Sequence, residues 1–200
     1  MSAVKREKLS GRSKGLSLPE LIIVLLVIAI LVVLALPQII SSRRLFRFSG
    51  MQRQISATLV EARPEAMSQR RAITFRYDDK NKRLITYGGS FGALGDANNK
   101  IIALSGSGVS LNEIRYGRPG GVSKSALADT TNMTALAQKN VDITFQPDGS
   151  VIDASNNPQN NALFFFHSIY KKDAAFAVSI LGAGGRIKVW RYSKGVNAYV

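Results

Sequence analysis

An uncharged aliphatic run near the amino end constrains this chain more than any other feature. The run covers residues 21–36, LIIVLLVIAILVVLAL, and counting from Leu16 the weakly polar stretch reaches 21 residues. A helix of roughly 20 apolar residues crosses the hydrocarbon core of a bilayer. The run is preceded by five basic residues: Lys5, Arg6, Lys8, Arg12 and Lys14. Because basic residues favour the cytoplasmic side, the sequence predicts one membrane-spanning helix with its amino end in the cytoplasm.

Two features separate this run from a cleaved secretory signal. Glu20 places a carboxylate at the start of the apolar segment, where charge is costly and usually functional. No small-x-small cleavage site closes the run, because Pro37 follows directly after it. The small residue that is positioned for cleavage is Gly15, which precedes the apolar segment. We therefore expect the helix to remain in the mature protein.

The order of these residues resembles the amino-terminal signature of type IV pilins and type II secretion pseudopilins. The chain has a basic leader ending in Gly15, an apolar Leu16, a carboxylate at Glu20 and then a long aliphatic helix. The resemblance implies cleavage between Gly15 and Leu16 by a prepilin peptidase, N-methylation of Leu16, and a non-enzymatic role in a fibre. It also implies that the partners are other major and minor pseudopilins or pilins and inner membrane lipid. Pro19 stands where the family often has an aliphatic residue, but Pro is tolerated near a helix start.

The position of Glu20 has a physical explanation of its own. An unpaired charge inside a bilayer costs about 2.5 to 3.5 kcal/mol on insertion scales. If several such helices bundle with a stagger, the amine of a neighbouring chain neutralises the carboxylate, so an unpaired Glu20 favours assembly. The alternative is that Glu20 lies solvated in the headgroup layer and has no role.

The sequence divides into four expected segments. Residues 1–15 form a cleaved leader, 16–37 a transmembrane and assembly helix, 38–71 an amphipathic continuation of the helix, and 72–200 a periplasmic β-rich domain. Apolar residues of the continuation recur at three- and four-residue spacing: Leu45, Phe48, Met51 or Gln52, Ile55, Leu59, Ala62 and Ala66. Pro37 predicts a kink in this helix, and Pro64 predicts a second bend or the helix end.

After Ala72 the pattern changes to short alternating segments. Loops are predicted over residues 88–100, 105–109 and 116–140, with helical character around 125–136. The expected strands cover residues 73–77, 84–87, 100–104, 110–116, 141–145, 150–153, 162–166, 174–181 and 185–192. The predicted fold class is therefore α+β, with a long amino-terminal helix whose C-terminal half packs against an antiparallel sheet.

The carboxy-terminal third carries a second resemblance. The turn with Phe145, Pro147 and Gly149, and the last strand with its opening Gly185-Arg186-Ile187, are similar to the domain of the GspH/FimT group of minor pseudopilins and minor pilins. The resemblance implies a GspH-like minor pseudopilin of a type II protein secretion system, which contacts other subunits or secreted cargo in the periplasm. Residues 88–140 match no motif.

Candidate chemistry elsewhere is sparse, and neither a metal nor a cofactor is expected. The absence of Cys excludes disulfides and thiolate sites. His167 is the single histidine and lacks a Ser-His-Asp arrangement, so it is expected in the core or at a sheet edge. Asp148 and Asp153 could supply oxygen ligands for Ca²⁺, but a turn explains Asp148. The glycines between Gly88 and Gly95 lack the Lys-Ser/Thr of a phosphate loop.

The basic balance of the chain leaves one alternative function. Net charge is +14, and removal of the leader takes away five basic residues and one acidic residue, which leaves +10. The last strand carries Arg186, Lys188 and Trp190 on one face, followed by Arg191. Basic side chains with interleaved aromatics bind phosphates and stack bases. The alternative is therefore a FimT-like minor type IV pilin that binds DNA for uptake, and the plainer interpretation is a solvated strand face.

Overall fold

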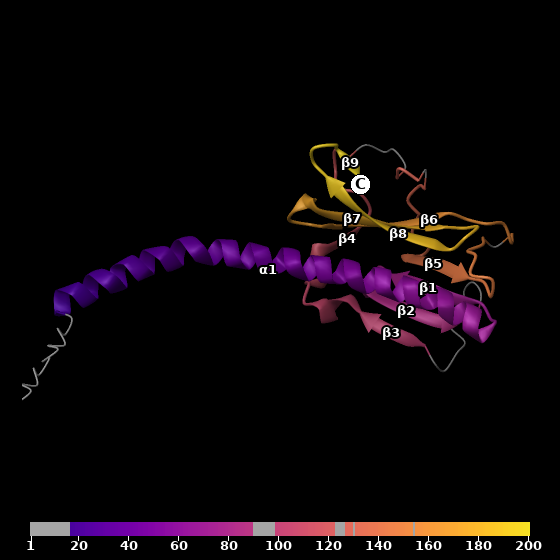
Figure 1. Cartoon of the computed structure of the whole chain (residues 1–200), viewed down its shortest axis with the longest axis horizontal. Helices are drawn as coiled ribbons and strands as arrows, with labels where there is room; N and C mark the ends of the chain where they lie inside the picture. The colour runs from indigo at the N-terminus through magenta and orange to yellow at the C-terminus, as the bar shows by residue number, and fades with distance from the viewer. Residues whose placement is uncertain (1–16, 90–98, 123–126, 130, 154) are drawn as a thin grey trace, which may run out of the picture. The chain divides into compact units, whose positions relative to one another are not determined.

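The chain folds as one long helix followed by antiparallel strands, as the sequence predicts. The computed structural model describes residues 17–89, 99–122, 127–129, 131–153 and 155–200. The chain divides into two compact units, Met1–Ser42 and Arg43–Val200. Within the described residues, helix α1 precedes all of the strands, β1 to β9 (Figure 1). The α+β class is thereby confirmed.

Helix α1 spans Leu18–Gln69 and contains 52 residues. Its helical conformation is continuous through Pro37 and Pro64. The alternative in which Pro64 ends the helix is wrong. One backbone hydrogen bond is lost at a proline, but the next turn buries Ala66 in the core, and such tertiary packing supplies most of the stability of helices in proteins.

The predicted apolar stripe on the C-terminal half of α1 is confirmed. Its buried residues are Phe48, Met51, Gln52, Ile55, Thr58, Leu59, Ala62 and Ala66. Leu45, which the stripe was expected to include, is 36% exposed. Arg53 and Glu61 lie on the exposed side of the helix, as amphipathic spacing requires.

The first sheet has four strands in the order β3-β2-β1-β5. Its strands are β1 Ile73–Asp78, β2 Arg83–Gly88, β3 Lys100–Ala103 and β5 Asn140–Phe145. The predicted hairpin is formed by β1 and β2, which pair from Ile73 opposite Gly88 to Asp78 opposite Arg83. On its other side β1 pairs antiparallel with β5, so that Ile73 lies opposite Phe145.

The second sheet has five strands in the order β4-β6-β7-β8-β9. Its strands are β4 Ile114–Tyr116, β6 Asn161–His167, β7 Lys171–Leu181, β8 Arg186–Ser193 and β9 Ala198–Tyr199. All of the pairings are antiparallel. The expectation of one sheet is therefore corrected to two, and β9 was not predicted.

Three local predictions are wrong. Residues 127–129 and 131–136 contain no helix, because this segment instead makes backbone bonds to the second sheet, including Thr134 N–H to Ala162 C=O at 2.9 Å. Residues 150–153 form only isolated bridges. The strand expected over 110–116 begins as the short 3₁₀ helix Leu111–Glu113 and is extended only at β4.

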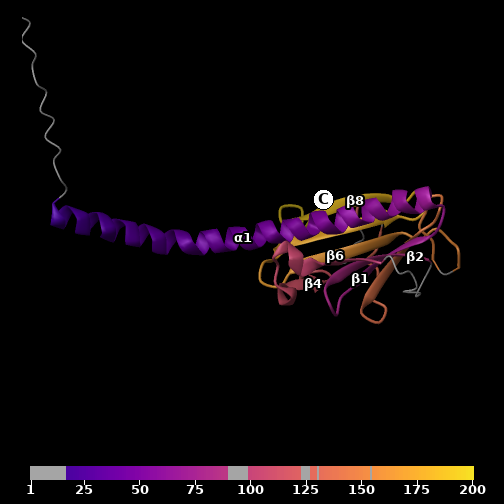
Figure 2. The ribbon, with the colours of Figure 1, turned by 90° about the horizontal axis from the view of Figure 1, so that it is seen from below.

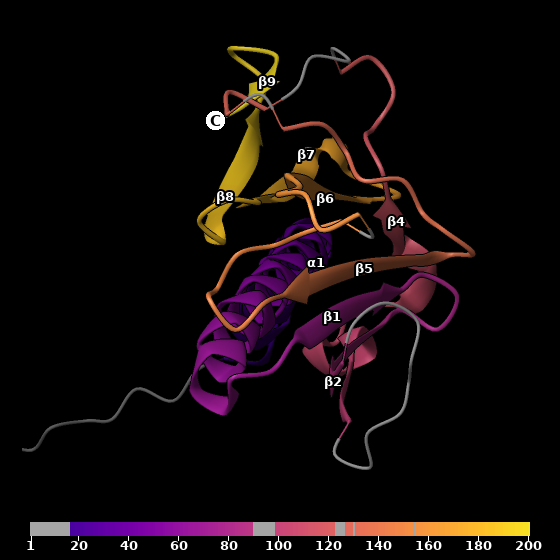
Figure 3. The same cartoon turned by 90° about the vertical axis from the view of Figure 1, so that its right-hand side faces the viewer.

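The main core joins the C-terminal half of α1 to both sheets (Figure 3). Aromatic rings bridge the layers: Phe165 of β6 lies 4.9 Å from Tyr77 of β1 and 5.4 Å from Phe176 of β7, between ring centroids. Phe176 in turn lies 5.3 Å from Phe48 of α1. A smaller cluster on the outer face of the second sheet packs around Phe164, Trp190 and Tyr199. Figures 1 and 2 place β8 alongside the C-terminal half of α1.

Candidate assembly helix and exposed basic strand

The N-terminal half of α1 exposes its aliphatic side chains. Glu20 is the only charged residue of the sequence between Leu18 and Ser42. The large apolar side chains from Leu18 to Ile40 are between 47% and 74% exposed. The helix contains a stretch that is long and apolar enough to cross a membrane by length and composition, and none of that stretch is buried. A surface of this kind requires an apolar environment or apolar partners.

The helix begins close to the predicted cleavage site. Gly15 and Leu16 themselves lie outside the described residues. The Leu21 N–H donates to the Ser17 carbonyl at 3.1 Å, which closes the first helical turn. Pro19 lies in this turn, where backbone N–H groups have no intrahelical acceptor, so the proline removes no helical hydrogen bond.

Glu20 lies exposed in the first turn of α1. A carboxylate is favourable there because the amino end of a helix carries partial positive charge. Pro37 lies within the continuous helix, and the kink predicted at this residue stays a prediction.

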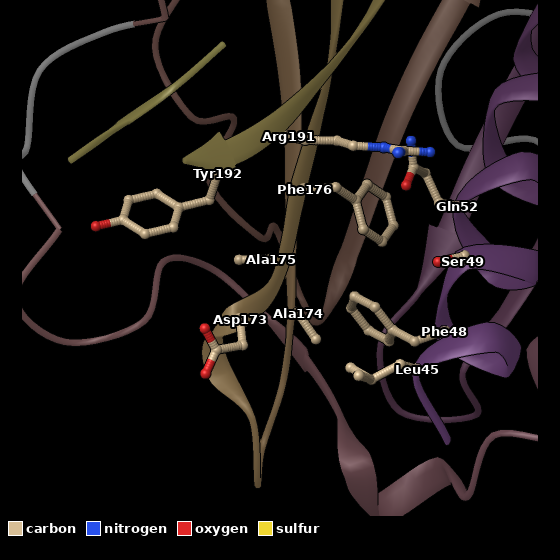
Figure 4. A pocket seen from close by; sticks show the side chains of 10 residues that line it. All are labelled: Leu45, Phe48, Ser49, Gln52, Asp173, Ala174, Ala175, Phe176, Arg191 and Tyr192. Carbon is tan, nitrogen blue, oxygen red and sulfur yellow. The ribbon is translucent and has the colours of Figure 1, made fainter. Parts of the chain in front are cut away.

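The basic residues predicted on the last strand lie on β8. Arg186 and Lys188 are exposed on the outer face of the second sheet, opposite Leu181 and Ser179 of β7. Arg191 is an odd number of residues away from both, so its side chain lies on the opposite face of the strand. It points toward Gln52 of α1 (Figure 4). The structure therefore brings Arg186 and Lys188 together and separates Arg191 from them.

Trp190 belongs to the small outer cluster and is only 3% exposed. Its indole Nε1–H donates to Ser179 Oγ at 2.8 Å, and the Ser179 hydroxyl donates to Asp129 Oδ2 at 2.5 Å. Lys188 Nζ lies 3.5 Å from the centroid of the indole ring. Burial of Asp129 alone would raise its pKa, but hydrogen bonds from Ser179 and Thr131 hold the pKa below the usual carboxyl value. The indole is thus a packing element, and its faces are not open to bases.

His167 lies in the core, with no exposed surface. Its Nδ1 accepts the Ile169 N–H at 3.2 Å, so the neutral ring carries its proton on Nε2, which lies 3.5 Å from Glu113 Oε2. Phe48 and Tyr170 pack against the ring. No group of three metal-ligating side chains occurs among the residues that the structure describes. The arrangement is that of a core histidine.

The two aspartates considered as calcium ligands are engaged in turns. Asp148 Oδ1 accepts the Ser150 N–H at 2.9 Å and the Ser150 hydroxyl at 2.7 Å, and these bonds lower the pKa of Asp148. Asp153 Oδ1 accepts the backbone N–H groups of Ser155 and Asn157. The glycine-rich loop between Gly88 and Gly95 lies largely outside the described residues.

No pattern in the sequence singles out Arg63 of α1, which contacts two turns of the domain. Gly149 and Gly185, the glycines of the two carboxy-terminal motifs, both have positive φ, at +81° and +57°. A Cβ on Gly185 would lie 1.9 Å from the Gly149 carbonyl oxygen and 2.9 Å from Arg63 Nε. A Cβ on Gly149 would lie 3.1 Å from the same nitrogen. Two turns that are far apart in sequence therefore meet at one arginine of α1. In the sequence, the two glycines are the only indication of this contact.

Comparisons with known proteins give structural similarity alone. No protein-family model and no curated protein sequence matches this chain. The chain is similar to the crystal structure of the Pseudomonas aeruginosa (strain PAO1) type IV minor pilin FimU in space group P21, with 19% identity, 74% of this chain and 90% of that chain covered, and a TM-score of 0.48. The crystal structure of the same FimU protein in space group P65 is also similar, with 19% identity, 73% of this chain and 94% of that chain covered, and a TM-score of 0.45. The function of this chain is therefore inferred from its own residues.

Proposed function

We propose that this chain is a membrane-anchored, non-enzymatic fibre subunit of the pilin and pseudopilin kind. The observation that carries the proposal is the N-terminal half of α1, an exposed aliphatic helix with one carboxylate, Glu20. A helix that is apolar on all sides is stable only in a bilayer or among other apolar helices. A subunit stored in the membrane and then packed into a fibre meets both conditions.

Glu20 suits the transfer from membrane to fibre. In the membrane its carboxylate is unpaired, at a cost of about 2.5 to 3.5 kcal/mol on insertion scales. In a staggered bundle the α-amine of Leu16 on a neighbouring chain neutralises it. That amine exists only after cleavage between Gly15 and Leu16, so processing and assembly are coupled through one ion pair.

The basic leader and the folded domain define the rest of the role. The leader holds the amino end in the cytoplasm, where a prepilin peptidase and methyltransferase acts on Gly15 and Leu16. The domain of residues 72–200 then lies on the periplasmic side of the inner membrane. We assign the chain to the GspH-like minor pseudopilins of a type II secretion pseudopilus, which contact other pseudopilins and secreted cargo.

Processing is tested by co-expression with a prepilin peptidase, followed by intact-mass measurement. We expect a mature chain that begins at Leu16 and carries one added methyl group. Gly15→Val should abolish cleavage, because a branched side chain occupies the space of the small residue at the scissile bond. Gly11→Val is the matched control within the leader and should be cleaved normally. An authentic amino terminus at Met1, or one beyond Pro37, would contradict the proposal.

Assembly is tested separately by Glu20→Gln, which keeps the size of the side chain and removes its charge. We expect this variant to be cleaved normally but to enter the fibre fraction at least tenfold less than the unaltered chain, because no ion pair forms with the Leu16 amine. Equal incorporation would show that Glu20 only occupies the headgroup layer.

A FimT-like minor pilin that binds DNA for uptake is the second candidate. The neighbouring exposed side chains of Arg186 and Lys188 favour it, since two cations on one strand match a phosphate backbone. The burial of Trp190 confines such binding to phosphates rather than bases. We expect binding with a steep salt dependence that is reduced by the double change Arg186→Ala, Lys188→Ala. No measurable binding at low salt would exclude this candidate.

A further inference from the structure

The outer edge of β8 is open over most of its length. Strand β9 pairs with β8 only at Tyr192 and Ser193, and one further pair of backbone bonds joins Arg191 to Val200. Backbone groups alternate in direction along a strand, so the N–H and C=O of Ile187 and Val189 point outward, as those of Arg191 do. No hydrogen bond between described residues uses these outward groups. The edge therefore offers two free donors and two free acceptors.

Two hollows lie between α1 and the second sheet, and one of them adjoins this open edge. At the start of β8 a hollow of about 450 Å³ is lined by Val60, Pro64 and Met67 of the helix and by Arg186 and Ile187 of the strand. A second, separate hollow of about 210 Å³ is lined by Ser49 and Gln52 of the helix, by residues 173–176 of β7 and by Arg191 and Tyr192 at the far end of β8 (Figure 4). We call the first hollow, together with the open edge of β8 beside it, the α1–β8 groove.

The helix side of the groove is apolar and exposed. Val60 is 55% and Met67 47% exposed, although both belong to the half of α1 that otherwise packs against the domain. Ile187 is partly buried and packs against the main core. A side chain placed in the groove would remove this apolar surface from water, at roughly 25 cal/mol per Å² of area.

The groove carries positive charge without acidic partners. Arg63 Nε is buried and lacks a hydrogen-bond acceptor among the described residues. Arg186 is exposed, and neither arginine has an ion pair in the part of the chain that the structure describes. The exposed guanidinium of Arg186 is therefore available to a carboxylate supplied by a partner.

The edge also lacks the usual protection against pairing. Lysines commonly guard exposed strand edges, but the Lys188 ammonium lies over the ring of Trp190, on the outer face of the sheet. The groove thus combines free backbone groups, an apolar wall and unpaired cations.

We propose that the α1–β8 groove binds an extended acidic segment of a different fibre subunit by β-strand addition. The added strand would pair with the outward groups of Ile187 and Val189, place alternate apolar side chains on Val60 and Met67, and place the intervening carboxylates on the outer face of the sheet, near Arg186. A second copy of this chain is a poor occupant, because the chain carries a net charge of +14 and the groove is itself cationic. The inference rests on the proposed function only in taking the partner to be a fibre subunit.

The test uses the full chain in detergent micelles and a blocked six-residue peptide of alternating valine and glutamate. We expect the peptide to slow amide hydrogen exchange at Ile187 and Val189 at least tenfold. A fully N-methylated peptide of the same side chains and charge should bind at least tenfold more weakly, because it cannot donate to a strand edge. Equal binding of the two peptides would overturn the proposal.

Variants distinguish binding in the groove from binding by general charge attraction. Arg186→Glu should weaken peptide binding at least tenfold, and Val189→Pro should do the same by removing one outward N–H without disturbing the bonds to β7. Lys80→Glu is the matched charge reversal, at an exposed position in the β1–β2 turn, and should change binding less than twofold. An equal loss with Lys80→Glu, or no loss with Arg186→Glu, would overturn the proposal. Peptide binding needs neither cleavage after Gly15 nor polymerisation, so failure here leaves the fibre role intact and the reverse also holds.

Discussion

The two halves of α1 share one continuous helical backbone and have opposite surroundings. Leu31, in the first half, is 59% exposed, whereas Leu59, in the second half, has no exposed surface. The first half is apolar on all sides, and the second carries an apolar stripe with Arg53 and Glu61 on its other side. A stripe is sufficient for one sheet-facing contact, whereas an all-round apolar surface needs neighbours on every side. The same secondary structure therefore packs against the domain in one half and presents an apolar surface in the other.

The second half is anchored at its far end by two turns. Arg63 lies beneath Gly149 and Gly185, and the helix ends a few residues later at Gln69. Gly185 has no room for a side chain, and at Gly149 a Cβ would require the side chains of Met67 and Arg63 to shift. The first half has no equivalent constraint between described residues, so changes in the two halves should have very different consequences for stability.

The largest effect on the packed half is expected from Gly185→Ala. The new Cβ would lie 1.9 Å from a backbone oxygen at a residue with φ of +57°. We expect the free energy of unfolding to fall by more than about 3 kcal/mol, because strain and overlap act together. Denaturation followed by the fluorescence of Trp190, the only tryptophan, measures this. Gly184→Ala is the control, since its Cβ would meet no atom within 4 Å, and an equal loss there would contradict the explanation.

A paired truncation tests the two halves directly. Leu59→Ala should lower the free energy of unfolding of the domain by about 2 to 5 kcal/mol, through lost burial and a residual cavity. Leu31→Ala, the same change in the exposed half, should alter it by less than about 0.5 kcal/mol. Both values come from the same fluorescence titration in micelles. If Leu31→Ala destabilises the domain as much as Leu59→Ala, the contrast between the halves does not hold.

Much of this fold could be predicted because its signals are local. The three- and four-residue spacing from Phe48 to Ala66 needs only helical geometry, and the β1–β2 hairpin needs only two alternating segments and a short turn. The division into two sheets could not be predicted, because alternation shows which side of a strand is buried but not which strand lies next to it. The sequence predicts helical character around residues 125–136 because its local composition does not show the partners of this segment in the second sheet. Its hydrogen bonds to β6 are contacts between distant parts of the sequence.

In the candidate site, too, local features could be predicted from the sequence and contacts between distant segments could not. Alternation correctly places Arg186, Lys188 and Trp190 on one face of β8. It does not show that Leu127 joins the same buried cluster as the tryptophan, because Leu127 comes from a distant loop. Gly149 and Gly185 belong to separate motifs in the sequence, and their contact with Arg63 depends on the complete fold. The open edge of β8 is likewise a property of strand order.

The smallest expected effect is a pH dependence at His167, where the packed half of α1 begins. Burial is the main cause of the lowered pKa of His167; Glu113 raises this pKa, and Arg44 lowers it further. Arg44 Nε lies 4.0 Å from Glu113 Oε1, so one carboxylate faces both the arginine and the histidine. Above the usual histidine pKa near 6.5 the ring is neutral in the folded and unfolded chains alike.

As the pH falls below 6.5, the unfolded chain takes up the proton first, so the free energy of unfolding should decline until the lowered pKa of the folded state is reached. Below that pKa the decline should stop. Unfolding midpoints between pH 7.5 and 5 measure it, and His167→Leu should remove the slope in this window. Glu113→Gln should extend the decline to lower pH, because it removes the charge that raises the pKa. A slope that persists in His167→Leu would assign the titration to other groups and leave the junction of the two halves insensitive to pH.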